Sequence, residues 1–395
     1  MKNASIPSDL VVIVAGIIAA MHVGKLPPAL PELREAFAMS LVDAGFLLSI
    51  VQLAGMAAGI LIGLFTDGLG SRRSILYGLV ALSLASVASG FARELWQLMV
   101  LRAIEGLVFY VTILPVPRVL RAIVPPERLA LKLGLWGAFM PIGTALALLC
   151  GPWVIGVAGW RGWWWLLAAI TTAMAIGVAA SVPRDAHGIA IAKAERAGVS
   201  RLRATLAARG PWLVALTFGA YSCQWMAIIG FLPTIYTQAG LTASVAGVLT
   251  AIVAAVNAIG NIAAGRLLHR GVRPERVLAA AFVAMIVCAI VAFGVPGPLW
   301  MRFFAVVLLS TSGGLIPGVL FSMAVEVAPG PQAVSTSVGL MQQLSCAGQF
   351  AGPPLVAWVA AATGGWQLTW TVTGGASLIG IALATALGRH RAART

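Results

Sequence analysis

Long apolar runs separated by short polar segments are the dominant pattern along this chain. A helix that crosses the hydrocarbon core of a bilayer needs about 20 mostly apolar residues, and the runs that reach this length predict twelve transmembrane helices. We place them at residues 10–30, 42–65, 74–92, 95–117, 133–155, 163–182, 211–234, 243–265, 277–295, 299–322, 333–360 and 367–387. The pattern predicts an all-α membrane protein.

The composition agrees with lipid as the solvent. Of the 395 residues, 60% are hydrophobic and only 10% are charged, whereas a soluble domain has about 25% charged residues. The remaining polar surface is too small to solvate a soluble protein of this size.

The net charge of +14 does not indicate nucleic-acid binding, because the basic residues fall between the apolar runs rather than along one stripe or tail. If the N-terminus is cytoplasmic, 20 of the 26 lysines and arginines fall in cytoplasmic segments. This is the positive-inside bias of membrane proteins. We expect a multi-pass protein of a bacterial-type inner (cell) membrane with both termini in the cytoplasm.

Similar residues recur about 200 positions apart, which indicates two related halves. Leu95-Trp96 corresponds to Leu299-Trp300, and Gly151-Pro152 corresponds to Gly352-Pro353. We therefore predict two pseudo-symmetric six-helix bundles around a polar linker, with bounds at 1–182, 183–210 (cytoplasmic) and 211–395. One chain supplies the complete twelve-helix unit, so a monomer is expected.

A loop between the second and third predicted helices carries a family resemblance. The segment Gly63-Leu-Phe-Thr-Asp67-Gly-Leu-Gly70-Ser-Arg72-Arg73 resembles the signature loop of the major facilitator superfamily, although Gly68 stands where the family has an arginine. Arg102-Ala-Ile-Glu105-Gly106 is similar to the family's motif in the fourth helix. The resemblance implies a secondary carrier in which two bundles rock about a central site by alternating access.

The end of the first predicted helix points to a group within that superfamily. The run Lys25-Leu-Pro27-Pro28-Ala-Leu-Pro31-Glu-Leu-Arg34 resembles the cyanate permease group, which has a basic residue before prolines. This resemblance favours a small organic or inorganic anion as the substrate.

Three basic side chains fall inside predicted helices, where ionisable groups are costly and usually functional. They are Lys25, Arg102 and Arg302, and the resemblance places their helices around the central cavity. Cations that converge there would favour an anionic substrate by Coulomb attraction, and an arginine matches a carboxylate in bidentate geometry. Alternatively, Lys25 and Arg302 extend to the outer interface and contact no substrate.

Glu105 and His22 are the candidates for proton coupling. Glu105 stands three residues after Arg102, so the two share one helix face. His22 belongs to the residue type that titrates near neutral pH. In the structural alternative, Glu105 only neutralises Arg102 and His22 only hydrogen-bonds a backbone group. Exchange of one anion for another remains open beside proton coupling.

Polar and aromatic side chains that face the cavity would set selectivity. Tyr221, Gln224 and Trp225 share a face of the seventh predicted helix at i, i+3 and i+4 and form the best such cluster. Further candidates are Gln52, Tyr110, Asn257, Gln342, Gln343 and Gln349. For any single one of these residues, hydrogen bonding between helices is the alternative.

Two groups near the membrane edges have other predicted roles. By the resemblance, Asp67, Arg72 and Arg73 gate the inward side together with Arg118; positive-inside topology alone would also explain the arginines. The three tryptophans at 163–165 fit an aromatic belt at the outer interface.

The sequence argues against an enzyme or an ATP-driven pump. The four histidines are scattered, without metal-ligand spacing, and there is no Walker-type glycine loop. The four cysteines lie far apart inside apolar runs and are expected to pack as small apolar residues. We expect no cofactor. Export of lipophilic compounds or drugs is the main alternative function, and a non-transporting membrane receptor on the same fold is another.

Overall fold

The computed structural model describes residues 7–59, 69–183, 201–330 and 333–393, and these residues are almost entirely helical. The N-terminal helices are α1 (Ser8–Gly24), α2 (Leu26–Ala36), α3 (Leu41–Ser49), η1 (Ile50–Gln52), α5 (Ser71–Gly90), α6 (Leu95–Ile113), α7 (Val116–Ile123), α8 (Pro126–Gly137) and α9 (Phe139–Ser181). The C-terminal helices are α11 (Arg209–Gln238), α12 (Ala243–His269), α13 (Pro274–Ala289), η2 (Ile290–Gly294), α14 (Leu299–Glu326), α15 (Val334–Thr363) and α16 (Trp370–Ala392).

Ten helical segments within the described residues are long and apolar enough to cross a bilayer. One of them, α9, has 43 residues and bends at Gly159, whose φ of 67° falls in a region that favours glycine. At 1.5 Å per residue, α9 is roughly twice as long as a hydrocarbon core is thick, so it supplies two crossings. The 30 residues of α15 supply another, and the predicted twelve crossings are confirmed.

The outer surface of the helices is apolar. Leu84, Val157, Ile176 and Leu378 are among many large apolar side chains that are mostly exposed. So many exposed apolar side chains would favour aggregation in water, and they are the side chains that lipid chains would cover. The membrane assignment therefore has support beyond the length of the helices.

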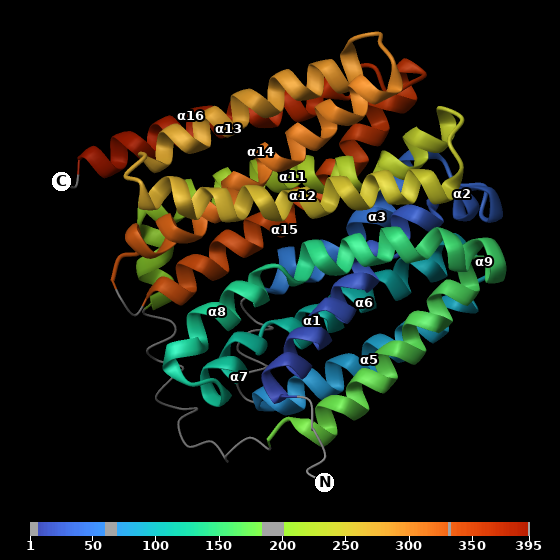
Figure 1. The fold of residues 1–395 in the computed structure, drawn as a ribbon, viewed down its shortest axis with the longest axis horizontal. Coiled ribbons are helices and arrows are strands. Elements are labelled where there is room, and N and C mark those ends of the chain that lie inside the picture. The colour runs from blue at the N-terminus through green and yellow to red at the C-terminus, as the bar shows by residue number, and fades with distance from the viewer. Residues whose placement is uncertain (1–6, 60–68, 184–200, 331–332, 394–395) are drawn as a thin grey trace.

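The helices form two halves that lie side by side, the first drawn blue to green and the second yellow to red (Figure 1). Between the halves, α3 packs on α15, α9 on α12, and α2 on α11. We call the end of the molecule away from the two termini the far end. It holds α2, the start of α3 and the bend of α9.

Apolar contacts unite the halves at the far end. One buried cluster joins Leu30 and Leu47 of the first half to Phe231 and Ala357 of the second. Nearer the termini, a buried cluster that contains Val11 and Val178 consists of residues from the first half alone. The halves are thus packed together at the far end of the molecule.

The predicted linker, 183–210, is only partly described. Residues 184–200 lie outside the described residues, residues 201–207 are helical, and α11 begins at Arg209. The division of the chain at this linker stays a prediction.

Candidate functional site

The first membrane-spanning segment is interrupted at Lys25, between α1 and α2. Pro27 and Pro28 follow the break, and a proline has no N–H to donate to the carbonyl four residues earlier. Pro27 therefore leaves the carbonyl of Val23 without its helical donor. The local sequence creates a backbone acceptor in the middle of the membrane segment.

Arg102 on α6 uses this acceptor. Its Nη2 donates to the Val23 carbonyl at 3.0 Å, and its Nη1 donates to the carbonyl of His22. The Arg102 side chain is only 1% exposed. The guanidinium thus replaces the one hydrogen bond that Pro27 removed, at Val23, adds a second one at His22, and fixes α6 against the break in the first segment.

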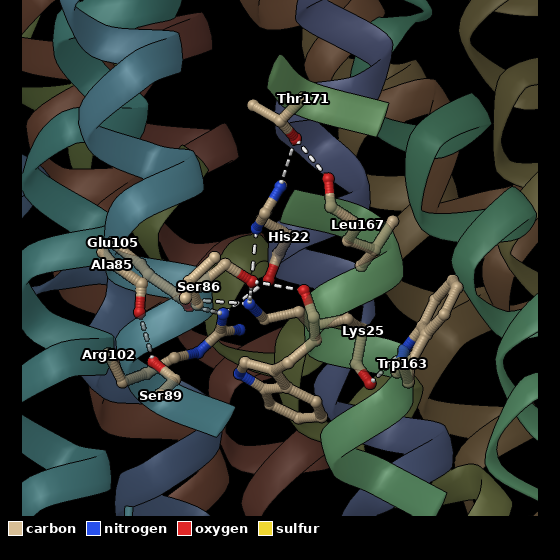
Figure 2. Close-up of polar contacts among 12 residues, drawn as sticks. His22, Lys25, Ala85, Ser86, Ser89, Arg102, Glu105, Trp163, Leu167 and Thr171 are labelled. Atoms are coloured by element: carbon tan, nitrogen blue, oxygen red, sulfur yellow. Dashed lines mark hydrogen bonds and ion pairs between the residues drawn. The ribbon is translucent and has the colours of Figure 1, made fainter. Parts of the chain in front are cut away.

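Glu105 joins two cations at the same place. Its Oε1 lies 2.6 Å from Lys25 Nζ, and its Oε2 lies 2.8 Å from Arg102 Nη1. Lys25 and Glu105 are both fully buried. Figure 2 shows that the two cations approach the carboxylate from α6 itself and from the α1–α2 break.

Lys25 donates to two further partners. Its Nζ lies 2.9 Å from Ser86 Oγ on α5 and 3.3 Å from His22 Nδ1. It also lies 4.7 Å from the centre of the Trp164 ring, within the range of a cation–π interaction. Every donor position of the ammonium is therefore directed to a polar group (Figure 2).

The hydrogen bonds assign the tautomer of His22. Thr171 Oγ1 donates to the carbonyl of Leu167, so it must accept from His22 Nε2, which lies 2.7 Å away. His22 Nδ1 then accepts from Lys25. The imidazole is neutral and carries its hydrogen on Nε2.

We call His22, Lys25, Arg102 and Glu105 the charge cluster. With a neutral histidine, two cations face one carboxylate, so the cluster has a surplus of one positive charge. His22 is at the midpoint of the 29-residue segment Ser8–Ala36, so this charge is deep in the membrane. Charges at this depth are costly and usually serve a function.

The structure brings together four of the candidates from the sequence, but not as a cavity lining. The charge cluster lies inside the first half, between α1, α5, α6 and α9, and its side chains are at most 1% exposed. The expectation that Lys25 extends to the outer interface is wrong. Trp163 and Trp164 are also buried, so the expected aromatic belt is wrong for both; Trp163 Nε1 donates to the Lys25 carbonyl.

Arg302 does not join Lys25 and Arg102, which corrects the expectation that the three cations converge. It lines a separate cavity within the second half, with residues of α11, η2, α14 and the segment before α16. The cations are therefore divided between the halves.

A second polar group connects the two halves. Tyr110 on α6 donates to Gln52 Oε1 at 2.5 Å, and its hydroxyl lies 3.0 Å from Cys346 Sγ on α15. Gln52 Nε2 donates to Gln349 Oε1 at 3.0 Å. We call Gln52, Tyr110, Cys346 and Gln349 the junction. All four side chains are buried.

The predicted cluster on α11 is divided by its partners. Tyr221 accepts from Asn257 on α12, while Gln224 accepts from Ser377 on α16. Trp225 and Tyr221 share a small apolar space inside the second half. These contacts match the alternative of hydrogen bonding between helices, and a role in substrate binding stays a prediction.

The predicted gate can be described only in part. Arg72 donates from Nε to the Val182 carbonyl at 2.8 Å and from Nη2 to the Ala179 carbonyl at 2.7 Å. It therefore ties the start of α5 to the end of α9. Asp67 lies outside the described residues, so a gate formed with Arg73 and Arg118 stays a prediction.

Sequence reasoning missed two features of this site. The Lys25–Glu105 pair joins positions 80 apart, and no local spacing indicates it. Cys346 was expected only to pack, yet it contacts Tyr110 at the junction. One available signal was the pair Pro27-Pro28, because prolines inside a membrane helix leave carbonyls that need other donors.

Comparison with known proteins adds a family match. A family model described as the Major Facilitator Superfamily matches residues 12–353 and 222–394. The cyanate transport protein CynX of Escherichia coli (strain K12) is 26% identical over 265 residues, 64% of this chain and 64% of that protein. The gallate transporter of Pseudomonas putida is 25% identical over 295 residues, 66% of this chain and 64% of that protein.

The match therefore spans just under two thirds of the length of each of these relatives. Among solved structures, a bacterial homologue of the human lysosomal transporter Spinster, in an inward-facing and occupied conformation, has a TM-score of 0.83. That match covers 96% of both chains at 17% identity, and it shows that the two share a fold.

Proposed function

This chain belongs to the Major Facilitator Superfamily of transporters, and from that premise we propose that it is a secondary carrier for a small anion. In this proposal the two halves rock about their contacts to open either side in turn. A proton gradient drives the transport, and Glu105 carries the proton. The observation that carries the proposal is the surplus positive charge of the buried cluster.

The charge balance favours an anion. Glu105 compensates only one of the two cations that it contacts. The remaining positive charge would attract an anion, and a guanidinium and an ammonium are the usual partners of carboxylates and small oxyanions. A cationic solute would add to the surplus and would be repelled.

Protonation of Glu105 would couple the movement of a proton to the movement of the anion. A proton on the carboxylate would leave Lys25 and Arg102 with no anionic partner, and the substrate anion would then take that place. When the anion leaves, Glu105 must lose its proton to pair with both cations again. One proton and one anion would therefore move together, and the step would be electroneutral.

The junction connects this exchange with movement of the halves. Glu105 and Tyr110 are both on α6, and Tyr110 reaches Gln52 and Cys346. A shift of α6 that accompanies a change of partner at Glu105 would alter the contacts between the halves. The packed far end faces the outside if both termini are cytoplasmic, as the distribution of basic residues favours.

The names of two relatives agree with an anionic substrate. CynX is a cyanate transport protein and the Pseudomonas putida relative is a gallate transporter. Cyanate is an anion at neutral pH, and gallate carries a carboxylate. The identities are low, so the relatives support the charge of the substrate and not its structure.

Counterflow in liposomes that contain the purified protein tests the substrate class. We expect exchange of labelled cyanate or gallate against the same unlabelled anion, and no exchange of a lipophilic cation. Arg102→Ala should abolish this exchange, whereas Arg102→Lys, which keeps the charge, should retain part of it. Size-exclusion chromatography checks that each variant is folded.

Export of a lipophilic compound is the second candidate. An apolar cavity of about 350 Å³ lies between α9 and α12, lined by residues that include Pro141, Leu149 and Ile252. A lipophilic solute could enter there from the bilayer. This alternative predicts counterflow of a lipophilic cation or neutral compound that survives Arg102→Ala, and such a result would overturn the anion proposal.

A further inference from the structure

A cavity of about 210 Å³ lies inside the second half at the far end of the molecule. Its walls come from the end of α11, from η2, from the start of α14 and from the segment that precedes α16. Gln367 lines the cavity and is exposed, so the cavity reaches the surface. None of the charge cluster or junction residues lines it.

Two polar side chains that line this cavity have atoms without a partner. Arg302 Nε is buried and makes no hydrogen bond, and the same is true of the Tyr236 hydroxyl. Tyr236 is 97% buried. Within the described part of the chain, no acidic side chain forms an ion pair with Arg302.

Although the two halves are similar, Arg302 and Arg102 differ in the partners of their side chains. Arg102 is compensated by Glu105 and by two carbonyls. Arg302 lines the cavity with its Nε unpaired instead, and it lies in the first turn of α14. The start of a helix adds partial positive charge through its own N–H groups. A buried donor left unpaired costs stability, and a bound acceptor would relieve that cost.

The remaining walls are mostly apolar and aromatic. Phe293 and Trp366 line the cavity together with Leu232 and Val306. The Trp366 Nε1 is already paired, because it donates to Gln238 Oε1 at 2.7 Å. The volume equals that of about seven water molecules at ~30 Å³ each, which is enough for one small organic molecule with a ring.

We propose that this cavity is a second ligand site, separate from the charge cluster, and that it binds a small carboxylate with an aromatic body. The carboxylate would accept from Arg302 and from the Tyr236 hydroxyl. The ring would lie against Phe293 and Trp366, where aromatic rings pack favourably. All of these residues belong to the second half, so the site persists when the halves move relative to each other.

Benzoate is the probe, and its binding to the purified full-length protein is measured by isothermal titration. Benzyl alcohol and benzylamine, which have the same ring without the negative charge, should bind at least about tenfold more weakly, because charge-assisted hydrogen bonds are the strong ones. Arg302→Met should weaken benzoate binding about tenfold or more. Tyr236→Phe removes one hydroxyl and should weaken it several-fold.

Arg93→Met is the matched control, since Arg93 is an exposed arginine outside the cavity lining. It should bind benzoate as the parent does. The proposal is overturned if the parent does not bind benzoate, if Arg302→Met and Tyr236→Phe both bind it normally, or if Arg93→Met weakens binding as much as Arg302→Met.

Protection from labelling locates the ligand. A Gln367→Cys variant is treated with a membrane-impermeant maleimide, and labelling of the parent at its own cysteines is subtracted. Benzoate should slow the labelling in Gln367→Cys and should fail to slow it when Arg302→Met is added. Unchanged labelling in Gln367→Cys would place benzoate elsewhere and would overturn the proposal. Because counterflow tests the charge cluster through Arg102, the two proposals can fail independently.

Discussion

Glu105 contacts a different cation with each of its carboxylate oxygens. Glu105→Gln removes the negative charge and leaves Lys25 and Arg102 buried beside an amide. Loss of one partner from a buried ion pair costs about 3–5 kcal/mol, so we expect a clear fall in the midpoint of thermal unfolding. A transported anion should restore part of this loss, because it would replace the missing charge.

Glu35→Gln is the control for this residue, because Glu35 is exposed on α2, away from the charge cluster. Its free energy of unfolding should stay within about 0.5 kcal/mol of the parent, as is usual for surface substitutions. A Glu105→Gln variant that is as stable as Glu35→Gln would contradict the description of the charge cluster.

At the scale of helices, the close approach of α6 to η1 depends on Gly106. A Cβ at this position would lie 2.1 Å from the Val51 carbonyl oxygen, well inside contact distance. We expect Gly106→Ala to destabilise the protein by about 1–3 kcal/mol through overpacking, measured as thermal unfolding. Gly156→Ala is the control, since a Cβ there meets nothing within 4 Å.

Equal stability of Gly106→Ala and Gly156→Ala would show that α6 and η1 are less closely packed than described. It would also weaken the proposal that α6 transmits a change at Glu105 to the junction, because that transmission needs a firm contact between these helices.

The helices could be predicted from the sequence largely because a bilayer fixes their length. The predicted span 243–265 is observed as α12, Ala243–His269, and the predicted span 299–322 is observed as α14, Leu299–Glu326. Two details were not predictable from hydrophobicity. The first segment breaks at Lys25, and α9 stays helical on both sides of Gly159. Both details depend on backbone geometry, which hydrophobicity does not report.

The site was less predictable than the helices. Depth in the membrane identified Lys25, Arg102 and Glu105 as unusual, but it did not show which way each side chain points. That direction depends on the rotation of each helix within the half, which long-range packing determines. Arg302 illustrates this limit, because the same argument placed it with Arg102 although it lines a different cavity.

At the scale of the whole molecule, the halves meet at the far end. A Cβ at Gly230 on α11 would lie 2.9 Å from Leu48 Cδ1 and 3.6 Å from Leu48 Cγ on α3, so side chains at these two positions are in direct contact. We expect a chain with Leu48→Cys and Gly230→Cys to form an intramolecular disulfide under mild oxidation. Anion transport should stop, and a reductant should restore it, because the halves must separate there to open the other side.

Each single cysteine variant serves as a control and should keep its transport under oxidation. If the double variant forms the disulfide, shown by mass spectrometry, and still transports the anion at the rate of the parent, the far end does not open during transport.

The most direct test of proton-coupled anion transport is the accumulation of a labelled anion in liposomes under an imposed pH gradient. The anion is whichever of cyanate or gallate gives counterflow. Coupling of one proton to one anion sets an accumulation limit of about tenfold for one pH unit, and the parent should approach it. Glu105→Gln should still exchange the anion but should not accumulate it. Accumulation by Glu105→Gln at the level of the parent would contradict the proposal that Glu105 carries the proton.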